Sequence, residues 1–169
     1  MNIPLEQVTI RSDLRPGDLG YVVYLHGAFY GPAYGYGIEF ETYVAAGIHE
    51  FYESYDPGKD RVWLCEYSNH IVGSLFLMHR EDNSAQLRYF LVLPEYQGLG
   101  LGKRLMQLLM DFVAERGYGS VYLWTTHDLS AAASLYKRHG FELTRETQST
   151  AFGKLLREQR YDVDIRSSG

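Results

Sequence analysis

A glycine-rich turn is the segment whose residue types most directly indicate chemistry. Three glycines alternate with other residues in the run Gln97-Gly98-Leu99-Gly100-Leu101-Gly102. Glycines let a ligand approach the backbone closely, and the first N–H groups of a helix have no intrahelical partner. A helix dipole adds partial positive charge at the same point, so the turn predicts a site for phosphate.

The spacing of these glycines argues against two better-known phosphate loops. A dinucleotide-binding turn needs G-x-G-x-x-G, and counting from Gly98 places Lys103 at the last position. A P-loop needs Ser or Thr after Gly-Lys, whereas Gly102-Lys103 is followed by Arg104. The turn therefore supports neither NAD nor ATP as the ligand.

Two motifs resemble those of the GNAT acetyltransferase superfamily. Residues 91–102 look like its cofactor motif, Gln/Arg-x-x-Gly-x-Gly/Ala, and residues 132–141 look like its A-x-x-L-Y-x-x-x-G-F signature. More narrowly, residues 123–126 and the pair Phe152-Gly153 are similar to the acetyltransferase half of bacterial MarR–GNAT fusion proteins. The resemblance extends over almost the whole chain and implies a single domain over residues 1–169.

The resemblance implies acetyl-CoA (coenzyme A) as co-substrate, and no metal is expected. The implied cofactor-binding residues are Leu91, Val92, Gln97, Gly98, Leu99, Gly100, Leu101, Gly102, Lys103, Ala133 and Tyr136. The strand end at Leu91 and Val92 would pair with the pantetheine arm, as a peptide strand does when it extends a sheet. Arg104 either adds charge near the phosphates or is a solvated residue on a helix face. Leu129 replaces an asparagine that is usual in the family.

The resemblance also gives Tyr136 the role of general acid, which protonates the departing thiolate of coenzyme A. The alternative is a tyrosine that only packs in the core. The general base is not identified, because the strand before the glycine turn, residues 86–90, contains no carboxylate. The candidates for the base are Glu41, Glu39, His26 and His127.

Four residues are expected to line the acceptor site: Tyr30, Tyr34, Arg88 and Trp124. Residues 30–37 hold three tyrosines in a stretch that reads as flexible and turn-prone, which core packing does not require. Arg88 faces either inward or outward on its strand. If it faces inward, the buried guanidinium needs an anionic partner, such as a carboxylate of the substrate.

These residues need a scaffold of alternating and helical patterns. Strands are expected at residues 7–11, 61–67, 71–78, 85–92, 120–125, 141–147 and 159–165. Helices are expected at residues 40–52, from about 100 to 116, and at 131–139, while residues 20–30 fit a helix or a strand. The class is α/β (α+β): the GNAT acyl-CoA N-acyltransferase fold, with a mixed, mostly antiparallel twisted sheet flanked by helices.

Composition narrows the class of function. The chain has 169 residues, a formal net charge of -5 and one cysteine, which argues against a nucleic-acid partner and an internal disulfide. It has no apolar run of the roughly 20 residues that cross a bilayer, so we expect a cytoplasmic protein without a membrane partner.

We expect an acetyl-CoA-dependent N-acetyltransferase that moves an acetyl group directly to a primary amine of a small molecule or peptide. The alternative is a non-catalytic acyl-CoA-binding regulatory module. A homodimer is compatible with the resemblance.

Overall fold

The computed structural model describes residues 3–165, in which seven strands form one sheet. The strands are β1 (Thr9–Arg11), β2 (Arg61–Tyr67), β3 (His70–His79), β4 (Ser84–Val92), β5 (Ser120–Thr126), β6 (Glu142–Ser149) and β7 (Leu156–Asp164). Their order across the sheet is β1-β2-β3-β4-β5-β7-β6. Only β4 and β5 pair in parallel, while all the other neighbours are antiparallel. The predicted mixed, mostly antiparallel sheet is confirmed.

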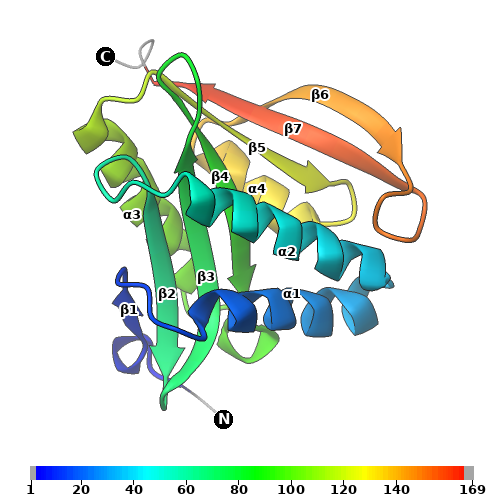
Figure 1. The fold of residues 1–169 in the computed structure, drawn as a ribbon, viewed down its shortest axis with the longest axis horizontal. Helices are drawn as coiled ribbons and strands as arrows, with labels where there is room; N and C mark the ends of the chain where they lie inside the picture. Colours follow the sequence, from blue (N-terminus) through cyan, green and yellow to red (C-terminus); the bar gives the residue numbers. More distant parts are fainter. Residues whose placement is uncertain (1–2, 166–169) are drawn as a thin grey trace.

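Helices cover both faces of the sheet (Figure 1). Helices α1 (Asp18–Tyr34) and α2 (Ile38–Glu53) lie side by side on one face, and α3 (Leu101–Arg116) and α4 (Ser130–Arg138) lie on the other. Short 3-10 turns, η1 (Leu5–Gln7) and η2 (Pro94–Tyr96), precede β1 and α3. Side chains alternate between the two faces of each strand, so each face buries its own apolar cluster. None of the helices in the described part of the chain has the length and apolar character of a membrane span.

The parallel pair β4–β5 is joined at one end only. Residues 84–86 pair with residues 120–122, and the register between the two strands stops there. Further along β4, Tyr89 and Phe90 lie opposite the single residue Leu75 of β3, which makes a β-bulge. Tyr89 adopts a φ of 54°, a value that is uncommon for a residue with a side chain. Because a bulge bends its strand, β4 presents an unpaired edge beyond residue 86.

Of the turn-prone stretch predicted at residues 30–37, only residues 35–37 lie outside a helix. Helix α1 continues through Pro32 to Tyr34, and both Tyr30 and Tyr36 are buried. The ring of Tyr36 lies 5.7 Å from Tyr30 and 5.6 Å from Phe152 in the loop between β6 and β7. Packing between segments that are distant in the sequence therefore overrides the local turn signal. Residues 20–30, which fitted either element, are helical.

Candidate active site

A groove of about 460 Å³ runs between the open edge of β4, the start of α3 and helix α4. The predicted cofactor residues that line it are Leu91, Val92, Gln97, Gly98, Gly100, Leu101, Gly102 and Lys103. Leu99 and Ala133 are not among its lining residues, and on α4 the neighbours Ala131 and Ala132 line it instead. Segments far apart in the sequence therefore meet along the predicted phosphate turn.

The backbone of this turn requires glycine at two of its three glycine positions. Gly98 and Gly100 have φ values of 79° and 86°, in the left-handed region that residues with a side chain rarely adopt. Gly102 lies inside α3, and a Cβ added there would be 3.5 Å from Leu135 and Phe90, an ordinary contact distance. The N-cap Gly100 provides no side-chain hydrogen bond, so the first N–H groups of α3 remain available beside the groove.

Two cationic side chains lie along the same groove. Lys103 stands in the first turn of α3 and Arg138 in the last turn of α4, and both line it. Arg104 is exposed and does not line it. Arg138 was not among the residues predicted for the site, although it follows Leu135 by three residues, a spacing that puts both on one helix face. Lys103 and Arg138 give the groove positive charge, which attracts phosphate groups.

The end of β4 is held by a side chain from the glycine turn. The Leu93 N–H donates to the carbonyl of Val72 in β3 at 3.0 Å. Because backbone groups of a strand alternate in direction, the N–H and C=O of Val92 face the open edge. The Gln97 side-chain amide donates to the Val92 carbonyl at 2.8 Å. The Val92 carbonyl is therefore occupied, and the Val92 N–H is available to donate to a ligand that extends along this edge.

A second cavity, with a volume of about 120 Å³, opens between β4, β5 and helices α1 and α2. Its wall is mostly aromatic: Tyr30, Tyr36, Phe40, Tyr43, Tyr89, Phe90, Trp124, Tyr136 and Phe152. Tyr30, Phe90 and Leu129 line both this cavity and the groove. Of the predicted acceptor residues, Tyr30, Arg88 and Trp124 line the cavity, whereas Tyr34 lines the groove. The two hollows therefore meet at shared walls.

Tyr136 projects from α4 to the wall of the aromatic cavity. Its side chain is buried, with its ring centroid 6.0 Å from that of Phe90. Burial raises the pKa of the Tyr136 phenol far above its usual range, and the nearby Tyr30 adds to the rise. The phenol therefore keeps its proton at any physiological pH and can serve as a hydrogen-bond donor.

The four predicted candidates for the base lie in different environments. His26 lines the aromatic cavity and is 3% exposed, and burial lowers its pKa to about 4. Its Nδ1 donates to the Val22 carbonyl at 2.8 Å, so Nε2 is left as the acceptor of a neutral ring. Glu41 lies against Gly27 of α1, outside the lining of either hollow. Glu39 is exposed, as is His127, whose Nδ1 accepts from the Arg157 N–H.

The carboxylate that does line the aromatic cavity belongs to Glu158 of β7, which was not among the predicted candidates. Glu158 lies opposite Thr126 in the register of β5 and β7, and Thr126 also lines the cavity. No local motif marks Glu158, because its place depends on which strand pairs with β5. Among the candidates for a base, Glu158 and His26 are the two that line the aromatic cavity.

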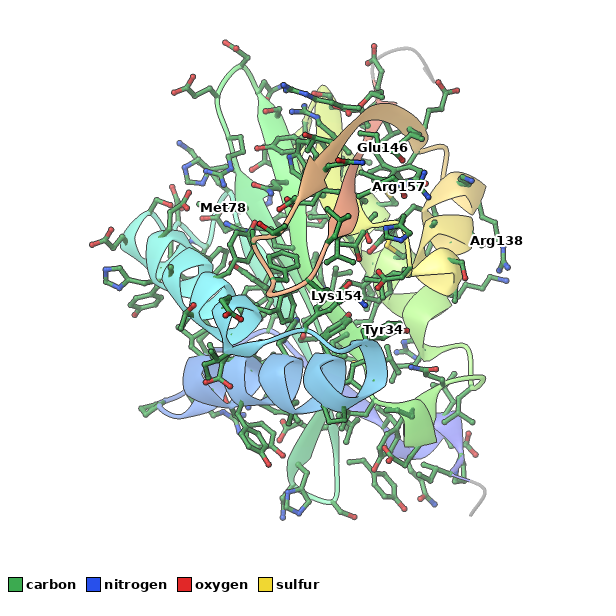
Figure 2. The ribbon with its side chains drawn as sticks, turned by 90° about the vertical axis from the view of Figure 1, so that its right-hand side faces the viewer. Tyr34, Met78, Arg138, Glu146, Lys154 and Arg157 are labelled. Carbon is green, nitrogen blue, oxygen red and sulfur yellow. The ribbon has the colours of Figure 1, made fainter. Side chains whose placement is uncertain are left out.

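A hydrogen-bonded cluster joins the rims of the two hollows. The Tyr36 hydroxyl lies 2.6 Å from Thr126 Oγ1 and donates to Asp128 Oδ1 at 2.9 Å. Burial disfavours the charged form of Asp128, but hydrogen bonds from Thr126 and Tyr36 outweigh it and lower its pKa. Lys154 lies 3.6 Å from Asp128 and donates to the carbonyl of Tyr34, beside which Figure 2 shows it. The β6–β7 loop is thereby fixed against the end of α1.

Comparison with known proteins gives a family match. The model of the acetyltransferase (GNAT) family matches residues 24–141. The uncharacterized N-acetyltransferase YjgM of Escherichia coli is 32% identical over 104 residues, 60% of this chain and 62% of that protein. The N-acetylaspartate synthetase of Danio rerio is 32% identical over 126 residues, 73% of this chain and 44% of that protein. The chain thus spans less than two thirds of the length of each of these relatives.

Solved structures share the fold at low sequence identity. An acetyltransferase from Streptococcus agalactiae superimposes with a TM-score of 0.74 at 19% identity, over 95% of this chain and 100% of that one. A GNAT family acetyltransferase from Elizabethkingia anophelis with acetyl-CoA bound gives a TM-score of 0.64 at 14% identity, over 95% and 99% of the two chains. At these identities the likeness establishes the common fold.

Proposed function

Since the chain belongs to the acetyltransferase (GNAT) family, we propose that it transfers an acetyl group directly from acetyl-coenzyme A to the amine of a small molecule or peptide. The observation that carries this proposal is the meeting of the two hollows. The groove beside the glycine turn and the aromatic cavity share Tyr30, Phe90 and Leu129 as walls. A thioester in the groove and an amine in the cavity would therefore come within reach of each other, and such positioning supplies much of the acceleration of a bimolecular reaction.

In this proposal coenzyme A occupies the groove. The N–H groups of residues 101–103 at the start of α3 would hold its pyrophosphate, with Lys103 and Arg138 adding charge. The open edge of β4 would hold the pantetheine arm, with the Val92 N–H as a hydrogen-bond donor. Acetyl-coenzyme A supplies an activated acyl group there, and the chain's own residues orient it and move the protons.

Proton transfer falls to groups on the wall of the cavity. The amine attacks as its neutral form, the acetyl C–S bond breaks, and the thiolate of coenzyme A leaves. Tyr136, which is protonated before the reaction because it is buried, donates its proton to that thiolate and regains one from solvent after coenzyme A has left. Glu158 accepts the proton of the amine, directly or through one water. His26 is a weaker base than an ordinary histidine, because burial lowers its pKa to about 4.

Binding and turnover distinguish this function from the alternative of an acyl-CoA-binding regulatory module. We would measure acetyl-coenzyme A binding by calorimetry and thiol release over a panel of primary amines. Binding together with amine-dependent thiol release supports the enzyme. Tight binding without release on any amine supports the module.

A pair of variants at Gly100 tests the cofactor site. Asp and Asn both tolerate the left-handed backbone of that residue better than other side chains do. Gly100→Asp adds a negative charge where the pyrophosphate would bind, and that charge is favourable at a helix N-terminus. We expect Gly100→Asp to weaken acetyl-coenzyme A binding at least about 10-fold relative to Gly100→Asn, without lower stability. Equal affinities of the two variants would remove the pyrophosphate from this turn.

The cytoplasmic location, the dimer and the relation to MarR–GNAT fusion proteins remain predictions. A size measurement by light scattering in solution would test the dimer.

A further inference from the structure

The wall of the aromatic cavity continues into a more polar hollow of about 370 Å³ over β4 and α2. Tyr43, Gln86, Arg88 and Trp124 line both of them. The polar hollow is also lined by Arg80 and Glu50. Two arginines and one glutamate leave this end of the cavity with an excess of positive charge.

Arg88 lines this wall without an adequate partner. The Arg88 side chain is 10% exposed, and its Nη1 is buried with no hydrogen bond, as is the hydroxyl of Tyr89 on the same wall. The carboxylate oxygen nearest to Arg88, Glu50 Oε2, lies 3.9 Å from Nη1, beyond hydrogen-bond distance. A buried charged donor without a hydrogen bond is unfavourable, so the site is incomplete as it stands.

The neighbouring Arg80, by contrast, has hydrogen-bond acceptors for its guanidinium. Its Nη1 donates to Glu50 Oε1 at 2.8 Å, and Nε and Nη2 donate to Gln86 Oε1 at 2.9 and 2.7 Å. Glu50 is therefore already the partner of Arg80, and its side chain is 53% exposed. Glu50 therefore binds Arg80, and Arg88 has no hydrogen-bonded anion.

The backbone is built to hold Arg88 in this position. The bulge places Tyr89 as well as Arg88 toward α2, and the Arg88 guanidinium lies 4.9 Å over the Tyr89 ring. On α2, a Cβ at Gly47 would overlap Arg88 Nη2 and the Tyr89 hydroxyl. Gly47 in α2 and the bulge in β4 thus make room for the Arg88 guanidinium.

We propose that Arg88 forms a carboxylate-binding subsite, so that the amine acceptor is an amino acid or another amine that carries a carboxylate. This inference rests on the proposed acetyl transfer, because only that reaction makes the bound ligand an acetyl acceptor. A guanidinium fork binds a carboxylate through two parallel hydrogen bonds, which would satisfy the buried Nη1.

The other charge on the cavity wall suits the opposite end of such a molecule. Glu158 lies on β7, with β5 between it and β4, so it is at least about 10 Å from Arg88 at the backbone. An ammonium group is attracted to Glu158 and a carboxylate to Arg88, which orients an amino acid across the cavity. A neutral amine would occupy the same cavity but leave the Arg88 donor without a partner.

The kinetic test compares acids with their amides. Glycine, β-alanine and 4-aminobutyrate are assayed against the three corresponding amides, with acetyl-coenzyme A as donor. For at least one pair, we expect kcat/KM to favour the acid about 10- to 100-fold, and Arg88→Gln to reduce that preference below about 3-fold through KM. The same compounds are used with both proteins, so differences in amine basicity cancel.

Two further variants make the result specific. Arg88→Lys keeps the charge but loses the fork, and we expect it to restore only part of the preference. Arg160→Gln removes an arginine that is paired with Asp162 and lines none of the hollows described here, so it should leave the preference unchanged. Equal kcat/KM for acids and amides in the wild type, or a preference that survives in Arg88→Gln, overturns the inference.

A binding measurement separates this inference from the acetyl transfer. Calorimetry with the same acids and amides, with and without coenzyme A, needs no turnover. Turnover of amines without any acid preference leaves the proposed function standing and refutes the subsite. Absence of turnover, together with acid binding that Arg88→Gln removes, refutes the proposed function and supports the subsite. Absence of both contradicts both.

Discussion

Replacing His26 should make the protein markedly less sensitive to mild acid. His26 is 3% exposed and packs between the rings of Tyr30, Phe40 and Tyr89. Burial lowers its pKa from 6.5 to about 4. The folded protein therefore holds this ring neutral, while the unfolded chain takes up a proton as the pH falls below 6.5. Stability from the neutral ring is complete above that value and is lost as the pH falls toward 4.

The size of this loss follows from the two pKa values. A shift of one pKa unit corresponds to about 1.4 kcal/mol, so the full effect at low pH is roughly 3 kcal/mol. Between about pH 7.5 and about pH 5, where the unfolded chain is largely protonated and the folded one is not, the loss is roughly 2 kcal/mol. Urea unfolding at both pH values gives this difference directly.

A double comparison isolates His26 from the carboxylates that also titrate. His26→Gln keeps a neutral donor for the Val22 carbonyl, whereas His49→Gln changes an exposed histidine on α2. The wild type and His49→Gln should each lose roughly 2 kcal/mol more than His26→Gln on acidification. If all three proteins lose the same amount, His26 is not held neutral by burial and the reasoning is refuted.

Three other predictions concern the site. Tyr136→Phe should lower kcat about 100-fold at neutral pH while the Kd of acetyl-coenzyme A changes little, since only a proton donor is lost; unchanged kcat would remove Tyr136 from the mechanism. Glu158→Gln should lower kcat by a similar factor, in contrast to Glu146→Gln on the exposed strand β6, and equal rates for both would exclude Glu158 as the base. Gly47→Ala should destabilise the fold by about 1–3 kcal/mol, because its Cβ overlaps Arg88; an unchanged urea midpoint would contradict this packing.

The parts of the site that depend on local sequence were predictable. The glycine turn is one, because alternating glycines before an amphipathic helix determine the backbone at Gly98 and Gly100 within a few residues. The positions of the seven strands along the chain were also predictable, since each strand shows its own periodicity. Such features need no knowledge of what packs against them.

The parts that depend on distant packing were not predictable. Tyr36 is in the core because Phe152, more than a hundred residues later, packs against it. Nothing in the local sequence indicates that Tyr89 takes a positive φ, yet this bulge decides the face on which Arg88 lies. Glu158 reaches the cavity through the β5–β7 register, so the search for a base in nearby sequence missed it.

The central claim is direct acetyl transfer between the two hollows, and isotope transfer tests it most directly. Acetyl-coenzyme A labelled in the acetyl group is incubated with the protein and an accepted amine, and the products are measured by mass spectrometry. We predict one labelled N-acetyl amine for each coenzyme A released, with no acetylated protein accumulating on the way. Release of coenzyme A with the label in free acetate, or on the protein instead of the amine, would contradict the claim.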